Sequence, residues 1–156
     1  MRKKVYLDTT IPSYLFDERA DLKYPCEITK KWWQEESDDF DIFTSTETVI
    51  ELDKGNYPKK QQVMEFIANL MILPQVLPIY SFAKVYIENF LMPKGLFGDA
   101  IHLAYSSYYK VDFLLTWNCN HLANANKEQH IRIINNKLNL STPSIVIPLQ
   151  LFKEAE

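Results

Sequence analysis

Glycine and cysteine are scarce in this sequence. Its three glycines, Gly55, Gly95 and Gly98, do not have the spacing of a phosphate-binding loop. Its two cysteines, Cys26 and Cys119, form neither a CxxC pair nor a disulfide framework, and no Cys/His zinc pattern is present. These absences argue against a glycine-rich nucleotide site, a zinc module and a disulfide-stabilised secreted scaffold, and the cysteine usage fits a reducing cytoplasm.

Long hydrophobic runs are also missing. Apolar stretches are interrupted by Pro74, Pro78 or a charge before they reach the roughly 20 residues that a membrane-spanning helix needs. Asp8 ends an early apolar segment of three residues, whereas a secretory signal needs roughly 7–15 apolar residues. We therefore expect neither a membrane segment nor a signal peptide, and we expect the protein to be cytoplasmic.

Net positive charge is absent as well. The formal net charge is −3, which gives no general electrostatic attraction to nucleic acid. Small basic groups at Arg2–Lys4, Lys30–Lys31 and Lys59–Lys60 each suit a solvated surface. If the protein acts on a phosphate backbone, a local feature must offset the overall charge.

The composition that remains is globular. Of the 156 residues, 47% are hydrophobic and 24% are charged, which predicts one domain spanning residues 1–156 around a single core. Short β-rich runs alternate with longer helical patterns, without repeats or linkers. This order predicts a three-layer α/β/α sandwich with a parallel, five-stranded sheet. The expected strands are Val5–Leu7, Asp41–Phe43, Gln75–Ile79, Phe113–Thr116 and Ile145–Ile147.

Helix signals separate these strands. Thr44 and Glu47 have the spacing of a capping box, which predicts a helix from there to Gly55. Ser81 is expected to cap a helix that runs to Asn89. The other expected helices start near Pro12, Pro25, Pro58 and Gly98, span Asn126–Lys137, and close the chain after Pro148 over residues 149–156.

Several polar residues fall where the predicted strands end. In parallel α/β folds, ligand sites form at that edge. Taken singly, each has an ordinary structural role, such as a helix cap, a turn former or a carboxylate favoured by a helix dipole. Carboxylates gathered at one edge repel one another unless a cation or shifted pKa values relieve them, and hard oxygen ligands suit Mg²⁺ or Mn²⁺. The candidates are Asp8, Glu51, Asp99, Thr116, Asn118 and Asn120.

Three segments resemble the motifs of the PIN-domain nuclease family. They are VYLDTTIPS, STETVIELDKG and GDAIHLAYSSYYKVDFLLTWNCN, in the family's order and spacing from Val5 to His121. The resemblance implies a PIN-like fold and a metal-dependent endoribonuclease similar to the VapC-type toxins of type II toxin–antitoxin pairs. It assigns the Mg²⁺ or Mn²⁺ ligands to Asp8, Glu51 and Asp99. It also implies an antitoxin protein as a partner, and cleavage that leaves a 5′-phosphate.

The fourth motif departs from the family pattern. By resemblance, Thr116 and Asn118 orient the attacking water or the phosphate. Many PIN domains carry a further aspartate where His121 stands, often an acid where Asn118 stands, and an aromatic residue where Leu122 stands. The number of metals therefore stays open. The alternative function is a catalytically weak or inactive module that binds RNA or a protein partner.

Two other phosphate-handling families fit less well. Asp8-Thr9-Thr10 is similar to the nucleophile loop of haloacid-dehalogenase-like phosphatases, but these require a second aspartate where Thr10 stands. A receiver domain requires paired acids after the first strand and a phosphorylatable aspartate after the third, where the sequence has Thr9 and Tyr80.

Aromatic residues add a possible interface. Trp32 or Trp33, and Tyr105, are expected in the core. The remaining aromatics, Tyr108 and Tyr109 among them, suit base stacking or a homodimer face.

Overall fold

Five parallel strands form the centre of the molecule. The computed structural model describes residues 1–154, and the strand order is β3-β2-β1-β4-β5. The chain adds β2 and β3 on one side of β1 and then β4 and β5 on the other, so β1 and β4 flank the point where the direction of winding changes. The strands are β1 (Lys3–Leu7), β2 (Phe40–Ser45), β3 (Met71–Leu73), β4 (Phe113–Leu115) and β5 (Ser144–Val146).

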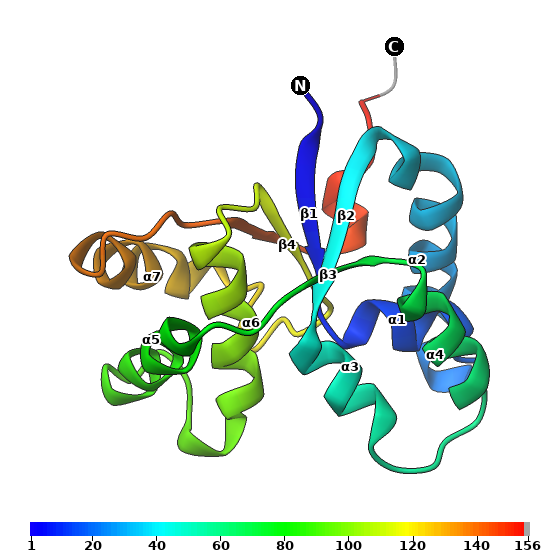
Figure 1. Ribbon diagram of the computed structural model, residues 1–156. Coiled ribbons are helices and arrows are strands. Elements are labelled where there is room, and N and C mark those ends of the chain that lie inside the picture. The colour runs from blue at the N-terminus through cyan, green and yellow to red at the C-terminus, as the bar shows by residue number, and fades with distance from the viewer. Residues whose placement is uncertain (155–156) are drawn as a thin grey trace.

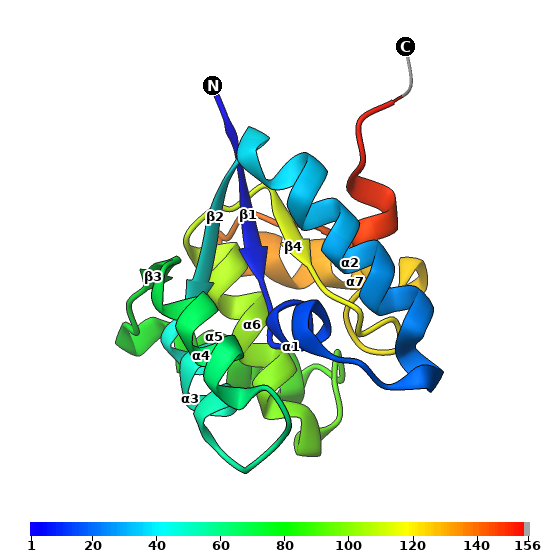
Figure 2. The ribbon, with the colours of Figure 1, turned by 90° about the vertical axis from the view of Figure 1, so that its right-hand side faces the viewer.

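Helices cover both faces of this sheet, which confirms the predicted α/β/α architecture. Figures 1 and 2 show α5, α6 and α7 on one face and α1, α2 and α4 on the other, with α3 beyond the carboxyl end of β2. None of the described helices is long and apolar enough to cross a membrane. The helices are α1 (Thr10–Phe16), α2 (Lys23–Glu36), α3 (Thr46–Asp53), α4 (Lys60–Ala68), α5 (Leu77–Glu88), α6 (Phe97–Tyr108) and α7 (Ala125–Lys137), with 3₁₀ turns η1 (Ala20–Leu22), η2 (Ser37–Asp39), η3 (Lys94–Leu96) and η4 (Pro148–Leu151).

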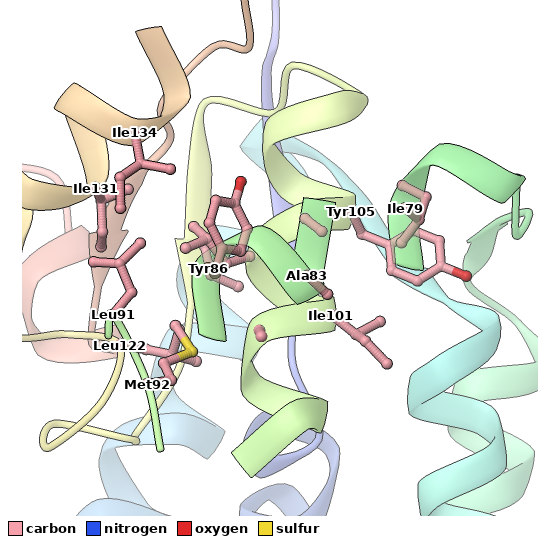
Figure 3. Packing of buried hydrophobic residues seen from close by; sticks show 14 of the residues in the cluster. Ile79, Ala83, Tyr86, Leu91, Met92, Ile101, Tyr105, Leu122, Ile131 and Ile134 are labelled. Carbon is pink, nitrogen blue, oxygen red and sulfur yellow. The ribbon is translucent and has the colours of Figure 1, made fainter. Parts of the chain in front are cut away.

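The two-residue period of β1 divides the core into two layers. Val5 and Leu7 pack with Trp32 of α2, whereas Tyr6 packs with the residues of α5, α6 and α7. Trp32 and Tyr105 are fully buried, as predicted. Figure 3 shows part of the second layer, with Ile79, Ala83 and Tyr86 from α5, Ile101 and Tyr105 from α6, and Ile131 and Ile134 from α7.

The predicted third strand is wrong. The strand at this edge is Met71–Leu73, and the segment expected to be extended instead starts α5 at Leu77. Pro78 lies in the first turn of α5, where its missing N–H costs no hydrogen bond and its fixed φ favours the helix. Ser81 therefore lies inside α5 and does not cap it.

The predicted capping box of Thr44 and Glu47 does not form, because the helix begins one residue later than predicted. Ser45 is the N-cap of α3, and its hydroxyl accepts from the Thr48 backbone N–H. Thr44 still belongs to β2 and donates to the carbonyl of Leu7 across the sheet at 2.8 Å. The helix ends near Gly55 as predicted, since Gly55 follows the C-cap residue with a φ of +78°.

The closing helix is also shorter than predicted. The chain forms a single 3₁₀ turn over Pro148–Leu151, and the Trp32 indole N–H donates to the carbonyl of Leu151 at 3.0 Å. The last part of the predicted helix, residues 155–156, lies outside the described residues.

Tyr86 provides a test of the α5–α7 contact. Its buried hydroxyl donates to Asn135 Oδ1 at 2.6 Å, and burial raises the pKa of Tyr86 to about 12. In the unfolded chain the phenol ionises near its ordinary value of 10.0. The contribution of the neutral phenol to stability is therefore complete below about pH 10 and is lost as the pH rises through about 12.

We expect Tyr86→Phe to be less stable than the wild type at pH 8, because Asn135 loses its donor. The wild type alone loses stability as this phenol ionises, so its free energy of unfolding should fall by about 2–3 kcal/mol relative to that of Tyr86→Phe between pH 10 and pH 12. Urea denaturation of both proteins across this range measures the gap, and the other tyrosines cancel in the comparison. A gap that stays constant with pH would contradict the buried, neutral hydroxyl.

Candidate functional site

Asp8 is the most buried carboxylate at the carboxyl edge of the sheet. It follows β1 directly and is only 2% exposed. Its Oδ1 accepts from the Thr10 backbone N–H at 2.9 Å and from the Thr10 hydroxyl at 2.5 Å, and its Oδ2 accepts from the Thr116 hydroxyl. The edge that follows β1 and β4 therefore holds a charged group in an environment built from hydroxyl donors.

Thr116 and Thr10 also tie this carboxylate to the loop after β4. Thr116 Oγ1 accepts from the Asn118 backbone N–H, and Thr10 Oγ1 accepts from the Trp117 backbone N–H, both at 2.9 Å. Each hydroxyl thus donates to Asp8 and accepts from the β4 loop. Thr116 lies where the sequence predicted it, and its role here is to hold the Asp8 carboxylate in position.

Glu51 reaches the same edge from α3. Its Oε1 lies 3.2 Å from Nε2 of His102, and its Oε2 accepts from the Thr9 hydroxyl. The start of α6 can approach the Glu51 carboxylate closely because Gly98 has no side chain. A Cβ built at that position would lie 2.8 Å from Glu51 Oε1. Gly98 therefore leaves the space that the Glu51 carboxylate uses, in addition to its place at the start of α6.

Asp99 lies in the first turn of α6, as predicted. It accepts from the Asn118 side-chain amide at 2.8 Å, and Asn118 Oδ1 accepts in turn from the His121 backbone N–H at 3.0 Å. Asn118 thus holds Asp99 on one side and closes its own turn on the other. Asn120, the remaining candidate, is exposed, and its carbonyl accepts from the Asn124 side chain.

His102 lies among the carboxylates, and the sequence reasoning missed it. It is 2% exposed on α6, with Nδ1 lying 2.6 Å from the Tyr6 hydroxyl and Nε2 lying 3.2 Å from the Thr9 hydroxyl as well as from Glu51. The available signal was its spacing: His102 follows Asp99 by three residues, which places both on one face of a helix.

The electrostatics agree with this arrangement. Burial alone lowers the pKa of His102, but the hydrogen bond to Glu51 and the charges of Glu51, Asp8 and Asp99 outweigh it, so the pKa lies above the ordinary value. An imidazolium can donate from both ring nitrogens, toward Tyr6 and toward Glu51. When protonated, His102 therefore supplies a counter-charge to this carboxylate group.

The three carboxylates respond differently to the same surroundings. Burial raises the pKa of Asp8 and of Asp99, and the charge of His102 opposes that rise in both. Burial also acts to raise the pKa of Glu51, but its hydrogen bonds to His102 and Thr9 hold it below the ordinary value. Burial, followed by the charge of Glu51, raises the pKa of Glu47, which lies one turn earlier on α3.

These side chains are of the types that bind divalent metals, but their arrangement does not form a metal-binding site. Carboxylate oxygens are the ligands that Mg²⁺ and Mn²⁺ prefer. Among residues 1–154, however, no group of three or more His, Cys, Asp or Glu side chains is arranged to hold an ion. The carboxylates of Asp8, Glu51 and Asp99 are instead engaged by hydroxyls, by an amide and by His102.

His121 lies next to this group. Its positive charge would lower the pKa of Asp99, which places the ring near that carboxylate. Its Nδ1 is buried and has no hydrogen-bond partner within the described part of the chain. The backbone N–H of the same residue donates to Asn118, whose amide donates to Asp99, so the turn after β4 links His121 to that carboxylate.

We predict that the Thr116 hydroxyl stabilises the ionised form of Asp8. Thr116→Val removes the hydroxyl, whereas Thr116→Ser keeps it and serves as the matched control. At pH 7 the valine variant should be less stable than the serine variant by about 1.5–3 kcal/mol, because a buried carboxylate loses a donor. Chemical denaturation of the two variants measures this difference.

The pH dependence of that difference has a definite sign. Losing the donor raises the pKa of Asp8 further above its ordinary value of 3.8. The unfolded carboxyl is the same in both variants and cancels, so the penalty is present while the folded carboxyl is ionised and disappears as the pH falls through the folded-state pKa values, which lie above 3.8. A difference between the valine and serine variants that is equal at pH 7 and pH 3 would contradict this role for Thr116.

Comparison with known proteins supports the fold. No protein-family model matches the sequence, and no curated protein matches it by sequence. The structure is similar to a chain of VapBC2 from Rickettsia felis, solved bound to a DNA fragment from the VapBC2 promoter, with a TM-score of 0.57. The two chains are 18% identical, and the similarity covers 92% of this chain and 96% of the other. This chain therefore has the PIN-like α/β fold, with a five-stranded parallel sheet between two layers of helices.

Proposed function

We propose that this protein is a Mg²⁺- or Mn²⁺-dependent endoribonuclease and the toxin of a type II toxin–antitoxin pair. The observation that carries the proposal is the gathering of Asp8, Glu51 and Asp99, from three separate elements, at the carboxyl edge of the sheet beside the buried ring of His102. The PIN-like fold and the structural similarity to VapBC2 support it.

Each side chain has a role in this proposal. Asp8, Glu51 and Asp99 would hold the metal, which, when bound, would supply an activated water and charge for the scissile phosphate. Thr116 keeps Asp8 oriented through its hydroxyl, and Asn118 keeps Asp99 oriented through its amide. Such support limits the motion of the carboxylates and preorganises them for a charged substrate.

A hollow beside Glu51 offers a place for the RNA. It has a volume of about 650 Å³, and its lining includes Arg19, Lys54 and Lys59. Asp17, Glu18 and Glu51 line the same hollow, so acids balance its three cations and the negative charge is offset only around individual basic side chains. Ion pairs already engage Arg19 and Lys59, so we assign the first contact with the RNA backbone to Lys54.

The partners follow from the same proposal. The similar chain comes from VapBC2, which was solved on promoter DNA. This supports an antitoxin protein as a partner in the cytoplasm. Three exposed apolar side chains suit a homodimer face. They are Leu77 on α5, Phe90 just after α5, and Tyr108 on α6.

One observation favours a second function. As arranged, the described residues do not form a metal-binding group, and each carboxylate already has partners. A PIN-like module that binds RNA or a protein partner without cutting RNA would retain this closed arrangement. The two functions differ in whether cleavage depends on a divalent metal and on Asp8.

We predict that Asp8→Asn and Glu51→Gln each reduce RNA cleavage by about 100-fold or more, because each removes a charged oxygen ligand of the proposed metal. The assay follows a panel of structured and single-stranded RNAs with Mg²⁺, with Mn²⁺ and with EDTA. The control is Asp53→Asn, which removes one negative charge from an exposed position on the same helix as Glu51.

The control should cut RNA like the wild type, and EDTA should stop cleavage. Circular dichroism and thermal melting establish that each variant is folded. Equal cutting by the wild type and Asp8→Asn would disprove the proposed site. Folded wild-type protein that binds RNA from the panel but cuts none of it would favour the binding module.

A further inference from the structure

The imidazole of His102 is held rigidly within the carboxylate group. Its Nδ1 lies 2.6 Å from the Tyr6 hydroxyl, which in turn lies 2.7 Å from the Ser45 hydroxyl. Its Nε2 lies 3.2 Å from both Glu51 Oε1 and Thr9 Oγ1. Contacts on both nitrogens, inside a pocket that leaves the residue 2% exposed, fix the plane and the direction of the ring.

The ring therefore fills the space toward which Glu51 is directed. Oε1 of Glu51 is in contact with the ring, and Oε2 accepts from Thr9. On the side of α6, Gly98 lies so close that a Cβ there would come within 2.8 Å of Oε1. Glu51 is thus held by Thr9 and His102 beside Gly98 while its side chain stays 29% exposed, and the ring that it contacts also interacts with the charges of Asp8 and Asp99.

We propose that His102 occupies the place of a divalent cation and weakens the binding of such an ion to Glu51 together with Asp8 and Asp99. An ion that binds all three carboxylates must first break the contact between His102 and Glu51. This inference rests on the proposed function, because it takes the same carboxylates as the ligands. It makes His102 a positioning residue that sets metal affinity rather than a ligand or a catalytic residue.

The structure offers a reason why the described residues hold no ready metal group. The residue types and their common edge suit a cation, yet no three of them converge around one point. The hydrogen bonds from Thr9 and His102 direct the Glu51 carboxylate toward α6. Removing the ring removes one of these two contacts with the Glu51 carboxylate and leaves the backbone of α3 and α6 in place.

The test is direct binding of Mn²⁺, without RNA, measured by isothermal titration calorimetry at one pH and ionic strength. We expect His102→Ala to bind Mn²⁺ roughly 10-fold to 100-fold more tightly than the wild type, because the ion no longer competes with a hydrogen bond to a charged group. His102→Gln fills more of the space and should change the affinity in the same direction by a smaller factor. His130→Ala removes an exposed histidine on α7 and is the matched control.

The double variant His102→Ala/Glu51→Gln identifies the site. It should lose the gain in Mn²⁺ affinity, because the carboxylate that the ring had covered is no longer charged. A purely structural role for His102 would lower stability without tightening metal binding. Thermal melting without metal establishes that each protein is folded, and His102→Gln replaces His102→Ala in the comparison if the alanine variant does not fold.

Two outcomes overturn the inference. The first is a folded His102 variant that binds Mn²⁺ no more tightly than the wild type, including the case in which neither binds. The second is a gain that persists in the double variant. Neither outcome decides whether the protein cuts RNA: cleavage that requires Asp8 with unchanged Mn²⁺ affinity in the His102 variants would keep the nuclease and reject this role for His102.

Discussion

Burial of charge where β1 ends is the constraint on which the rest of this site depends. Asp8 is almost fully buried, and an ionised carboxylate in such a place is costly unless donors and a counter-charge surround it. Thr10 and Thr116 provide the donors, and His102 provides the counter-charge. Because these residues come from α1, the β4 loop and α6, satisfying one carboxylate fixes three elements relative to one another.

The pleat of β1 links this site to the core. Tyr6 and Asp8 are two residues apart, so their side chains point to the same face of the sheet, the face covered by α6. Tyr6 packs in the core there and uses its hydroxyl to contact His102. Val5 and Leu7 point to the opposite layer. A shift of β1 by one residue would therefore disrupt the core and the site together, which specifies the register strongly.

The sequence predicts the parts of this structure that rest on local patterns. Asp8 could be placed because it directly follows β1, and Asp99 because it lies in the first turn of α6. Both elements have clear sequence signals. The third strand is misplaced because β3 is a short edge strand that is largely exposed, and Pro78, which weakens the predicted strand over Gln75–Ile79, lies in the first turn of α5. His102 could not be assigned a role because the partner that orients its ring, Tyr6, is 96 residues away along the chain. Contacts of that kind depend on the fold and leave no local pattern.

Asn118 shows why the departure from the family pattern fits this particular site. Its amide lies 2.8 Å from Asp99, and a carboxylate there would face Asp99 with like charge in a partly buried setting, where repulsion is strong. The amide of Asn118 instead donates a hydrogen bond to Asp99, and its oxygen accepts from the His121 backbone N–H in the turn after β4. The charge of His102 acts on Asp8, Glu51 and Asp99 together, and a further carboxylate at position 118 would add to the negative charge that it has to balance. The neutral residue at 118 and the histidine at 102 are therefore two consequences of the same limit on buried negative charge.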